Sequence, residues 1–310
     1  MTIRSATPSA RSPRPASRPD LLALPAFSSV VTEDDLSRTL DWRGKPIKCR
    51  ECEHQSINAA GLCAKGQACI RDRRARRVDR FLKENRDLAD SYLDHPYFEV
   101  RTCAARYASL FKLPPLLEDP EPEVRAMATL RLPEDRIRHM ARDEDSHVRM
   151  AAASRLKGAD LVQLITDQDY RVRLTAVRRM PDDLLPLVMN DPDPEVRAWV
   201  ARKVPLAALP DMSFDPDPLV RREVAARIPM KQLGLLARDS DMRVRFAVAE
   251  RIPEEQLPQF LNDSEQLIRD LARERIDKVP GLAERLAQSD KQPRIFLLKD
   301  ASTHNTETGK

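Results

Sequence analysis

The chain has 310 residues, of which 33% are charged and 5% aromatic, and its formal net charge is +4. It holds 25 prolines and 7 glycines, which reverses the usual balance. So few glycines exclude folds that need many left-handed turns, such as hairpin-rich sandwiches, and glycine-rich phosphate loops. No dinucleotide, P-loop, zinc-protease or serine-hydrolase motif occurs.

Residues 1–30 are predicted to be a disordered tail rich in proline and arginine. Their composition partly resembles an organellar transit peptide, but the prolines prevent an amphipathic helix. There is no secretory signal segment, and no apolar run approaches the roughly 18 residues of a membrane span. We therefore expect a cytoplasmic protein that does not enter a membrane.

Residues 93–290 repeat with a period of 24. A Val-Arg or Ile-Arg pair recurs eight times without insertion, and its first residue is numbered here as position 0 of each copy. These residues are Val100, Val124, Val148, Val172, Val196, Val220, Val244 and Ile268. One such repeat cannot bury its apolar face alone, so about eight repeats are predicted to stack into a solenoid.

Each copy predicts one α-helix and a short return segment. In the fifth copy Asp193 suits the N-cap, Pro194 suits the first helical position, and Pro205 at position 9 ends the helix. The remaining residues, about thirteen per copy, are too few for a second full α-helix and lack a strand pattern. A 3₁₀ or irregular helical turn is therefore predicted. The fold class is an all-α superhelical solenoid.

Charged positions recur as regularly as the apolar ones. Arg occupies position 1 in every copy, and a basic residue occupies position 7 in copies two to eight. An Asp lies five residues before position 0 in seven copies: Asp119, Asp143, Asp167, Asp191, Asp215, Asp239 and Asp263. We interpret these residues as a structural ladder of Asp–Arg pairs. The alternative is an arginine stripe for phosphates or an acidic partner.

Residues 31–92 hold a four-cysteine segment followed by a basic run. Cys49, Cys52, Cys63 and Cys69 have the spacing C-x2-C-x10-C-x5-C. The short spacer lets the first pair reach one metal, and the longer loop brings the second pair to its other side. Spacing alone leaves four-thiolate zinc and a 4Fe–4S cluster open, with two disulfides as the alternative without metal.

Cations around the cysteines favour the cluster, because they stabilise anionic thiolates. Six arginines of the basic run are candidate contacts for an anion or a partner: Arg71, Arg73, Arg74, Arg76, Arg77 and Arg80. The run 71–86 is predicted to be a solvated helix beside the cluster, and nucleic-acid binding is its alternative role. His54 is an alternative ligand, and Cys103 is predicted to be a packing residue.

The cysteine segment followed by repeats of the form D-x-D-x-x-V-R-x-x-A-A-x-R-[LI]-P resembles the leucine-rich repeat variant (LRV) proteins, over roughly residues 40–290. The resemblance implies alternating α- and 3₁₀-helices in a right-handed superhelix. It also implies an N-terminal 4Fe–4S domain whose ligands are the four cysteines, and an association with nitrogen fixation. Lys157 at position 9 of the third copy departs from the pattern. Residues 291–310 are predicted to cap the last repeat and then fray.

No group of residues has the pattern of a catalytic site, so we predict a protein that is not an enzyme. His139 and His147, at different positions of neighbouring copies, are predicted to be surface residues. Three functions remain: an interaction scaffold that binds a protein partner and whose cluster is structural or senses oxygen or iron, an electron carrier, and a nucleic-acid-binding repeat protein. Residues 1–92 carry a net charge of +6 and the rest −2, which disfavours nucleic acid along the solenoid.

Overall fold

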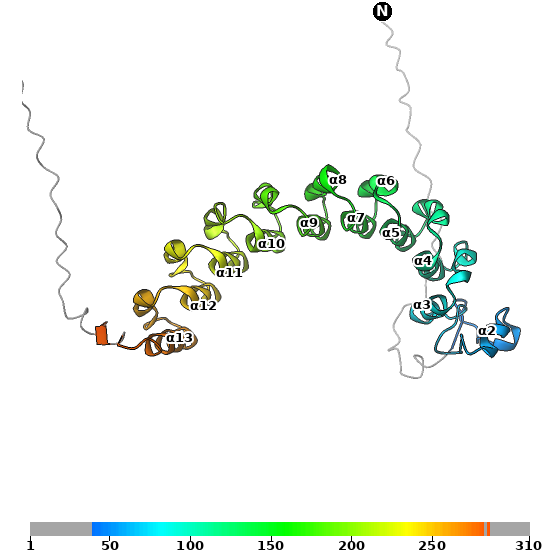
Figure 1. The fold of residues 1–310 in the computed structure, drawn as a ribbon, viewed down its shortest axis with the longest axis horizontal. Helices are drawn as coiled ribbons and strands as arrows, with labels where there is room; N and C mark the ends of the chain where they lie inside the picture. The colour runs from blue at the N-terminus through cyan, green and yellow to red at the C-terminus, as the bar shows by residue number, and fades with distance from the viewer. Residues whose placement is uncertain (1–38, 282–283, 286–310) are drawn as a thin grey trace, which may run out of the picture.

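The computed structural model describes residues 39–281 and 284–285, and these residues form a curved stack of helices (Figure 1). The long α-helices line the concave side of the arch, and shorter helical segments line the convex side. No strand occurs in this part of the chain, where pairing is limited to isolated bridges such as Asp41–Asp72. The predicted tail 1–30 and the C-terminal cap 291–310 lie outside the described residues.

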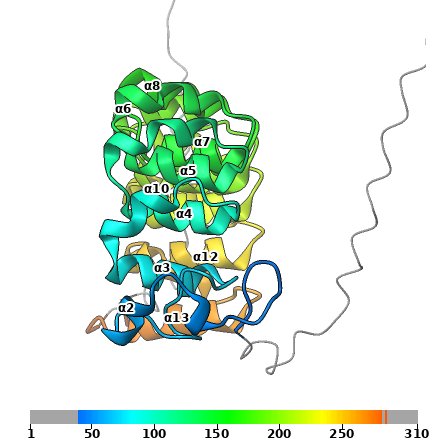
Figure 2. The same ribbon diagram turned by 90° about the vertical axis from the view of Figure 1, so that its right-hand side faces the viewer.

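The concave layer contains one long helix per repeat, preceded by α3. These helices are α3 (Ala75–Glu84), α4 (Phe98–Tyr107), α5 (Pro122–Arg131), α7 (Ser146–Ala153), α9 (Tyr170–Val177), α10 (Pro194–Lys203), α11 (Pro218–Arg227), α12 (Met242–Arg251) and α13 (Gln266–Asp277). The eight sequence copies correspond to α4 through to α13 in this list. The cysteine segment adds η1 (Cys49–Glu51) and α2 (Gln55–Ala59) at the N-terminal end of the arch (Figure 2).

The convex layer confirms the prediction that a 3₁₀ helix fills each return. Its 3₁₀ segments are η2 (Arg86–Tyr92), η3 (Leu110–Lys112), η4 (Pro114–Glu118), η5 (Arg138–Arg142), η6 (Gln163–Thr166), η7 (Asp182–Val188), η8 (Leu209–Phe214), η9 (Met230–Leu236) and η10 (Glu254–Phe260). Two returns begin with a short α-helix, α6 (Glu134–Ile137) and α8 (Gly158–Val162).

The predicted caps set the ends of the inner helices. Asp193 accepts a hydrogen bond from the backbone N–H of Glu195 at 2.8 Å, and Pro194 is the first residue of α10. The helix ends at Lys203, two residues before Pro205, because proline cannot continue the hydrogen-bond pattern. Asp145, Asp169, Asp217 and Asp241 cap their helices in the same way.

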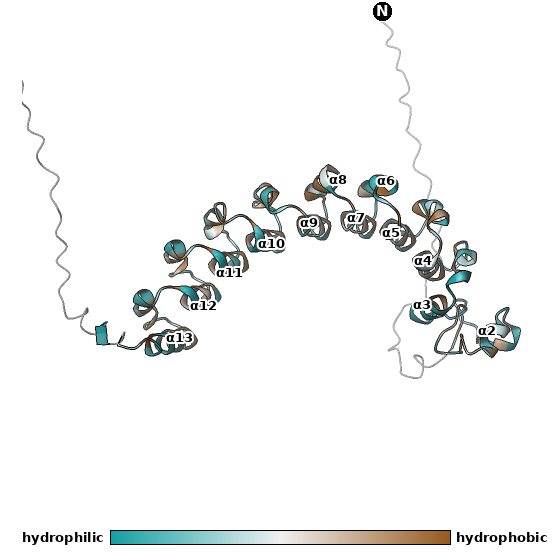
Figure 3. Cartoon of the chain, viewed as in Figure 1, coloured by the Kyte–Doolittle hydropathy of each residue, from teal (hydrophilic) through white to brown (hydrophobic). Residues whose placement is uncertain are grey.

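The apolar core lies between the two layers. Position 0 is buried in every copy, and so are the leucine or isoleucine residues at position 13 of the returns. Each inner helix consequently contains both apolar and polar residues, as the mixed colours of Figure 3 show. Burying such side chains contributes about 25 cal/mol per Å² of apolar surface, and this term favours stacking of neighbouring repeats.

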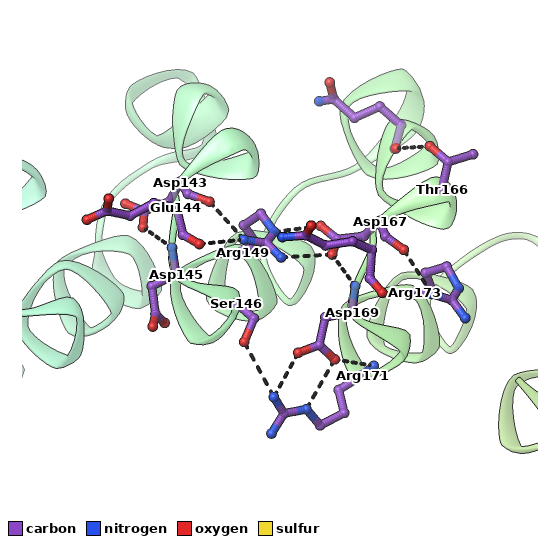
Figure 4. Close-up of polar contacts among 12 residues, drawn as sticks. Asp143, Glu144, Asp145, Ser146, Arg149, Thr166, Asp167, Asp169, Arg171 and Arg173 are labelled. Carbon is purple, nitrogen blue, oxygen red and sulfur yellow. Dashed lines mark hydrogen bonds and ion pairs between the residues drawn. The ribbon is translucent and has the colours of Figure 1, made fainter. Parts of the chain in front are cut away.

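The position-1 arginines form the predicted ladder, and those of copies one to seven each join two repeats. Arg149 donates from Nε and Nη2 to the carboxylate of Asp167, 18 residues later, at 2.6 and 3.0 Å. Its Nη1 donates to the backbone carbonyl of Asp143 in its own repeat. Figure 4 shows the same contact one repeat later, where Arg173 donates to the backbone carbonyl of Asp167. The same paired geometry recurs from Arg101–Asp119 to Arg245–Asp263.

The position-7 arginines form a second set of links, to backbone carbonyls and not to the aspartates of the ladder. Arg227 donates to the carbonyls of Ala201 and Val204, at the end of the preceding inner helix. Arg251 makes the equivalent bonds to Ala225 and Ile228. Cations are favourable at the negative end of a helix, so these side chains cap the C-termini of their neighbours.

Backbone geometry explains Lys157, which replaces the proline of position 9 in the third copy. Lys157 has a φ of −137°, whereas the equivalent Pro181 has a φ of −57°. Proline is restricted to φ values near −65° and cannot adopt the conformation that starts α8. Gly158 follows with a φ of +53°, a left-handed conformation that favours glycine.

The basic run 71–86 forms an additional unit of the solenoid. Its helix α3 is followed by η2, and it buries Val78, Phe81 and Leu82. Asp79 accepts hydrogen bonds from Arg106 and from the hydroxyl of Tyr107 on α4. The predicted helix is therefore present, but one of its sides packs into the stack.

Candidate metal centre

The four cysteines of the N-terminal segment lie around one loop region. Cys49 begins η1, Cys52 is the residue that follows it, and Cys63 and Cys69 come after α2. All four are free thiols, which removes the disulfide alternative for this structure. Burial raises the pKa of Cys63, and the charges of Cys52 and Cys49 raise it further. This coupling places Cys63 in the electrostatic neighbourhood of the first pair.

Cys69 belongs to the same neighbourhood and is the most enclosed of the four. Burial raises its pKa to about 11, with additional contributions from the charges of Cys52 and Cys49. A thiol with this pKa is protonated at neutral pH, so a bound cation must displace the proton when the thiolate becomes a ligand. Metal binding at this residue is therefore coupled to proton release.

N–H groups favour the anionic form of three of the four sulfurs. The backbone N–H of His54 donates to Sγ of Cys52 at 3.5 Å. A hydrogen bond from the side chain of Asn58 lowers the pKa of Cys63, and one from the backbone of Arg71 lowers that of Cys69, each opposing the larger effect of burial. Such donors stabilise sulfur in its anionic form and tune iron–sulfur centres.

The cysteine segment has little apolar core of its own. Helix α2 and segment η1 contain no buried residue, and the loop is held by hydrogen bonds such as Asn58 Nδ2 to the carbonyl of Cys63 at 2.9 Å. Within residues 39–281 and 284–285, no group of three or more His, Cys, Asp or Glu side chains is arranged to hold a metal ion. The four thiols match the donor chemistry of an iron–sulfur group, and their assignment as ligands stays a prediction.

Two comparisons bear on the identity of this chain. Residues 39–91 match the family model described as LRV protein FeS4 cluster. A solved leucine-rich repeat variant "with a novel repetitive protein structural motif" is similar in fold, with a TM-score of 0.66 and 36% identity, over 73% of this chain and 97% of that one.

The chain belongs to the leucine-rich repeat variant family. Its N-terminal segment is the family's iron–sulfur domain, and its repeats have the LRV fold, as the sequence predicted. An "uncharacterized 27.7 kDa protein in nifB 3′region" of Rhodobacter capsulatus is 51% identical over 94 residues, which is 30% of this chain. The match spans 38% of that protein, so the two share a part and not their whole length.

The six arginines that were predicted as contacts for an anion or a partner of the LRV protein differ in their contacts and exposure. Arg77 pairs with the buried carboxylate of Asp72 at 2.9 Å, and is therefore committed to the fold. Arg71 donates from its side chain to the carbonyl of Glu51, beside the cysteine loop. Arg76 and Arg80 are exposed on α3.

The remaining two arginines have structural roles through their backbones. Arg74 is the N-cap residue of α3, and its N–H donates to Asp72. The carbonyl of Arg73 accepts a hydrogen bond from the hydroxyl of Tyr97. The arginines thus do not form one continuous surface, and the role predicted for them as a group stays a prediction.

Two residues near the cysteines have other contacts. His54 lies with its Nε2 in hydrogen-bond contact with the hydroxyl of Tyr92, and its ring packs near Phe81, with centroids 5.3 Å apart. Cys103 is buried on α4, where its thiol lies 3.6 Å from the carbonyl of Ala75, and burial raises its pKa to about 11. This placement confirms Cys103 as a packing residue.

Asn58 and Tyr92 are residues of this region that sequence reasoning did not find. Asn58 supports the loop around Cys63, and Tyr92 donates to Glu53 at 2.9 Å across 39 residues of sequence. Neither residue belongs to a motif, so only the folded loop reveals them. His139 and His147 are both exposed, as predicted.

Proposed function

We propose that this LRV protein binds a 4Fe–4S cluster and acts as a non-enzymatic interaction scaffold. Cys49, Cys52, Cys63 and Cys69 would supply the thiolates, with N–H groups from His54 and Arg71 supporting two of the sulfurs. The observation that carries the proposal is this set of free, hydrogen-bonded thiols within an iron–sulfur domain. Bound there, the cluster would supply a redox-active or oxygen-labile group.

The shape of the solenoid supports a scaffold. Stacked repeats present an extended concave surface, and such surfaces are the usual binding faces of repeat proteins. The hollow around Arg149 and Arg173 is lined by side chains that hold the ladder together. None of the helices described is long and apolar enough to cross a bilayer.

A sensing role follows from how weakly the cysteine loop is otherwise held. Because η1 and α2 contain no buried residue, the loop depends on its ligands for order, and loss of the cluster would release it. We propose that this cluster-dependent loop acts as a sensor in the cytoplasm, and that it serves nitrogen fixation, a process that oxygen inhibits. The support for a role in nitrogen fixation is the relative from the nifB 3′ region.

A comparison of three forms of the protein tests this proposal. The intact protein, Cys49→Ser and Cys103→Ser are used as anaerobic baits in extracts of nitrogen-fixing cells. We expect a partner with intact protein and with Cys103→Ser, since Cys103 is a buried packing residue. The same partner should be absent, or weakly bound, with Cys49→Ser. Equal recovery by all three baits contradicts a cluster-dependent scaffold.

A further inference from the structure

The centre of the concave surface carries a tryptophan that the repeat pattern does not require. Trp199 lies at position 3 of α10, where the other copies have Cys, Met, Ala, Thr, Glu or Leu. Positions 0, 4 and 8 of the helix face the core, so helical spacing turns position 3 toward the concave side. Trp199 is partly buried and packs against the edge of the core, yet no other copy has an aromatic residue at this position.

Two arginines of neighbouring repeats lie over the indole ring. The guanidinium carbon of Arg178, at position 6 of the fourth copy, is 5.1 Å from the ring centroid. That of Arg202, at position 6 of the fifth copy, is 5.8 Å away. The indole Nε1 of Trp199 is buried and has no hydrogen-bond partner among the described residues. Exposed cation–π contacts are weak, so the arginines can exchange this contact for a stronger one.

The carboxylates nearby do not balance these cations. Arg202 and Arg222 both donate to Glu223, at 2.9 and 2.7 Å, so two guanidinium groups share one carboxylate. Arg178 has no carboxylate at ion-pair distance in the described part of the chain. A guanidinium with free donors and an aromatic face at one place is the composition of a binding hot spot.

Among copies four to eight, the positive charge of the outward positions is concentrated in copies four to six. On the outward positions −1, 2, 3 and 6, copies four to six carry four arginines and two glutamates: Arg171, Arg178, Arg202, Arg222, Glu195 and Glu223. The same positions of copies seven and eight carry one arginine and three acidic residues: Arg243, Glu250, Asp270 and Glu274. A local excess of one sign selects a partner segment of the opposite sign.

We propose that Trp199, Arg178 and Arg202 form the docking site for an acidic protein segment on the concave surface. Its carboxylates would accept hydrogen bonds from the two guanidinium groups, which carry one charge each at any physiological pH. An apolar side chain of the segment would then pack on the indole face. This inference rests on the proposed scaffold function, of which it names the contact surface and the partner's chemistry.

Poly-L-glutamate serves as the probe, with Trp199 as the reporter. The chain has two tryptophans, so Trp42→Phe leaves Trp199 alone, and the full-length protein is kept anaerobic. We expect a saturable change in Trp199 fluorescence that weakens as ionic strength rises from about 0.01 to about 0.1 M, where the screening length falls from about 30 to about 10 Å. Poly-L-lysine of equal length should give no such change.

Matched charge variants decide whether the site is specific. Arg178→Ala with Arg202→Ala should weaken binding about tenfold or more, since each removes charge-assisted hydrogen bonds. Arg136→Ala with Arg138→Ala removes the same charge from exposed side chains of the convex layer and should leave binding unchanged. No saturable change, or equal loss in both double variants, overturns the proposed site.

Iron content measured on the same samples separates the two proposals. A sample that contains iron but does not bind poly-L-glutamate contradicts the docking site and leaves the cluster proposal standing. A sample without iron that still binds in an arginine-dependent way contradicts the cluster and supports the docking site. Both measurements use the same full-length protein. A circular dichroism spectrum of each variant shows whether it keeps its helical fold.

Discussion

Arg173 donates from Nε and Nη2 to the two carboxylate oxygens of Asp191, both at 2.8 Å. The two residues belong to successive repeats, and their side chains are 9% and 2% exposed. The pair therefore links repeats through a nearly buried, bidentate contact. Replacing both charges with apolar residues is often neutral in such a setting, whereas removing one leaves the other without compensation.

The first prediction concerns this pair. Arg173→Met leaves the buried carboxylate of Asp191 without its cation, and we expect a loss of about 3–5 kcal/mol in unfolding free energy by urea titration. Arg171→Met is the control, because Arg171 is 46% exposed and pairs within its own repeat, with Asp169. It should lose much less stability, because an exposed ion pair contributes little. Equal losses in the two variants contradict a structural ladder.

The second prediction concerns the glycine after Lys157. Gly158 has a φ of +53° and Gly234 has no positive φ, yet a Cβ at either position meets nothing within 4 Å. Gly158→Ala should therefore destabilise the protein by about 1–2 kcal/mol through backbone strain alone. Gly234→Ala should be neutral or slightly stabilising. Thermal unfolding of the two variants makes the comparison, and an identical shift would contradict this explanation of α8.

The third prediction is the effect of acid. Hydrogen bonding from Arg245 lowers the pKa of Asp263 below that of an unfolded aspartate, about 3.9. Asp263 therefore binds fewer protons in the folded chain, and its stabilising contribution is complete above this value and disappears as the pH falls through the lowered pKa. Unfolding free energy should decrease from pH 5 toward pH 3. Asp263→Asn, which cannot titrate, should show a smaller decrease, and an unchanged slope would contradict the assignment.

The fourth prediction concerns removal of the cluster. Chelation under oxidising conditions should increase amide exchange in residues 49–69, where η1 and α2 have no core of their own. Exchange in α10–α12 should change little, because each repeat contacts its neighbours and not the distant domain. Hydrogen exchange measured by mass spectrometry distinguishes the regions. A uniform increase over the whole chain would contradict a local role for the metal.

Much of the fold was predictable because the same capping residues and helix-ending prolines recur in most copies. Asp193, Pro194 and Pro205 predicted the start and end of α10 from local chemistry, and the structure has these caps. The partner of Arg197 was not predictable in the same way. Asp191 and Asp215 recur with the same period, and only stacking shows that the side chain pairs with Asp215 while Asp191 offers its backbone carbonyl.

The sequence named the candidate ligands, whose assignment stays a prediction, but it did not predict the groups that surround them. Four cysteines at short spacing indicate a metal centre in any fold. The donors around them depend on how the loop closes, which spacing does not contain, as the contact of Asn58 with Cys63 illustrates. The run 71–86 was predicted to be a solvated helix. The helix is present, but one side of α3 packs on α4 through contacts such as Asp79 with Arg106.

The most direct test is the metal content of the protein purified without oxygen. Iron, acid-labile sulfide and zinc are measured per chain, for the wild type, Cys49→Ser and Cys103→Ser. We expect about four irons and four sulfides in the wild type and in Cys103→Ser, and their loss in Cys49→Ser. Stoichiometric zinc without iron, or full iron content in Cys49→Ser, would contradict a 4Fe–4S cluster held by the four cysteines.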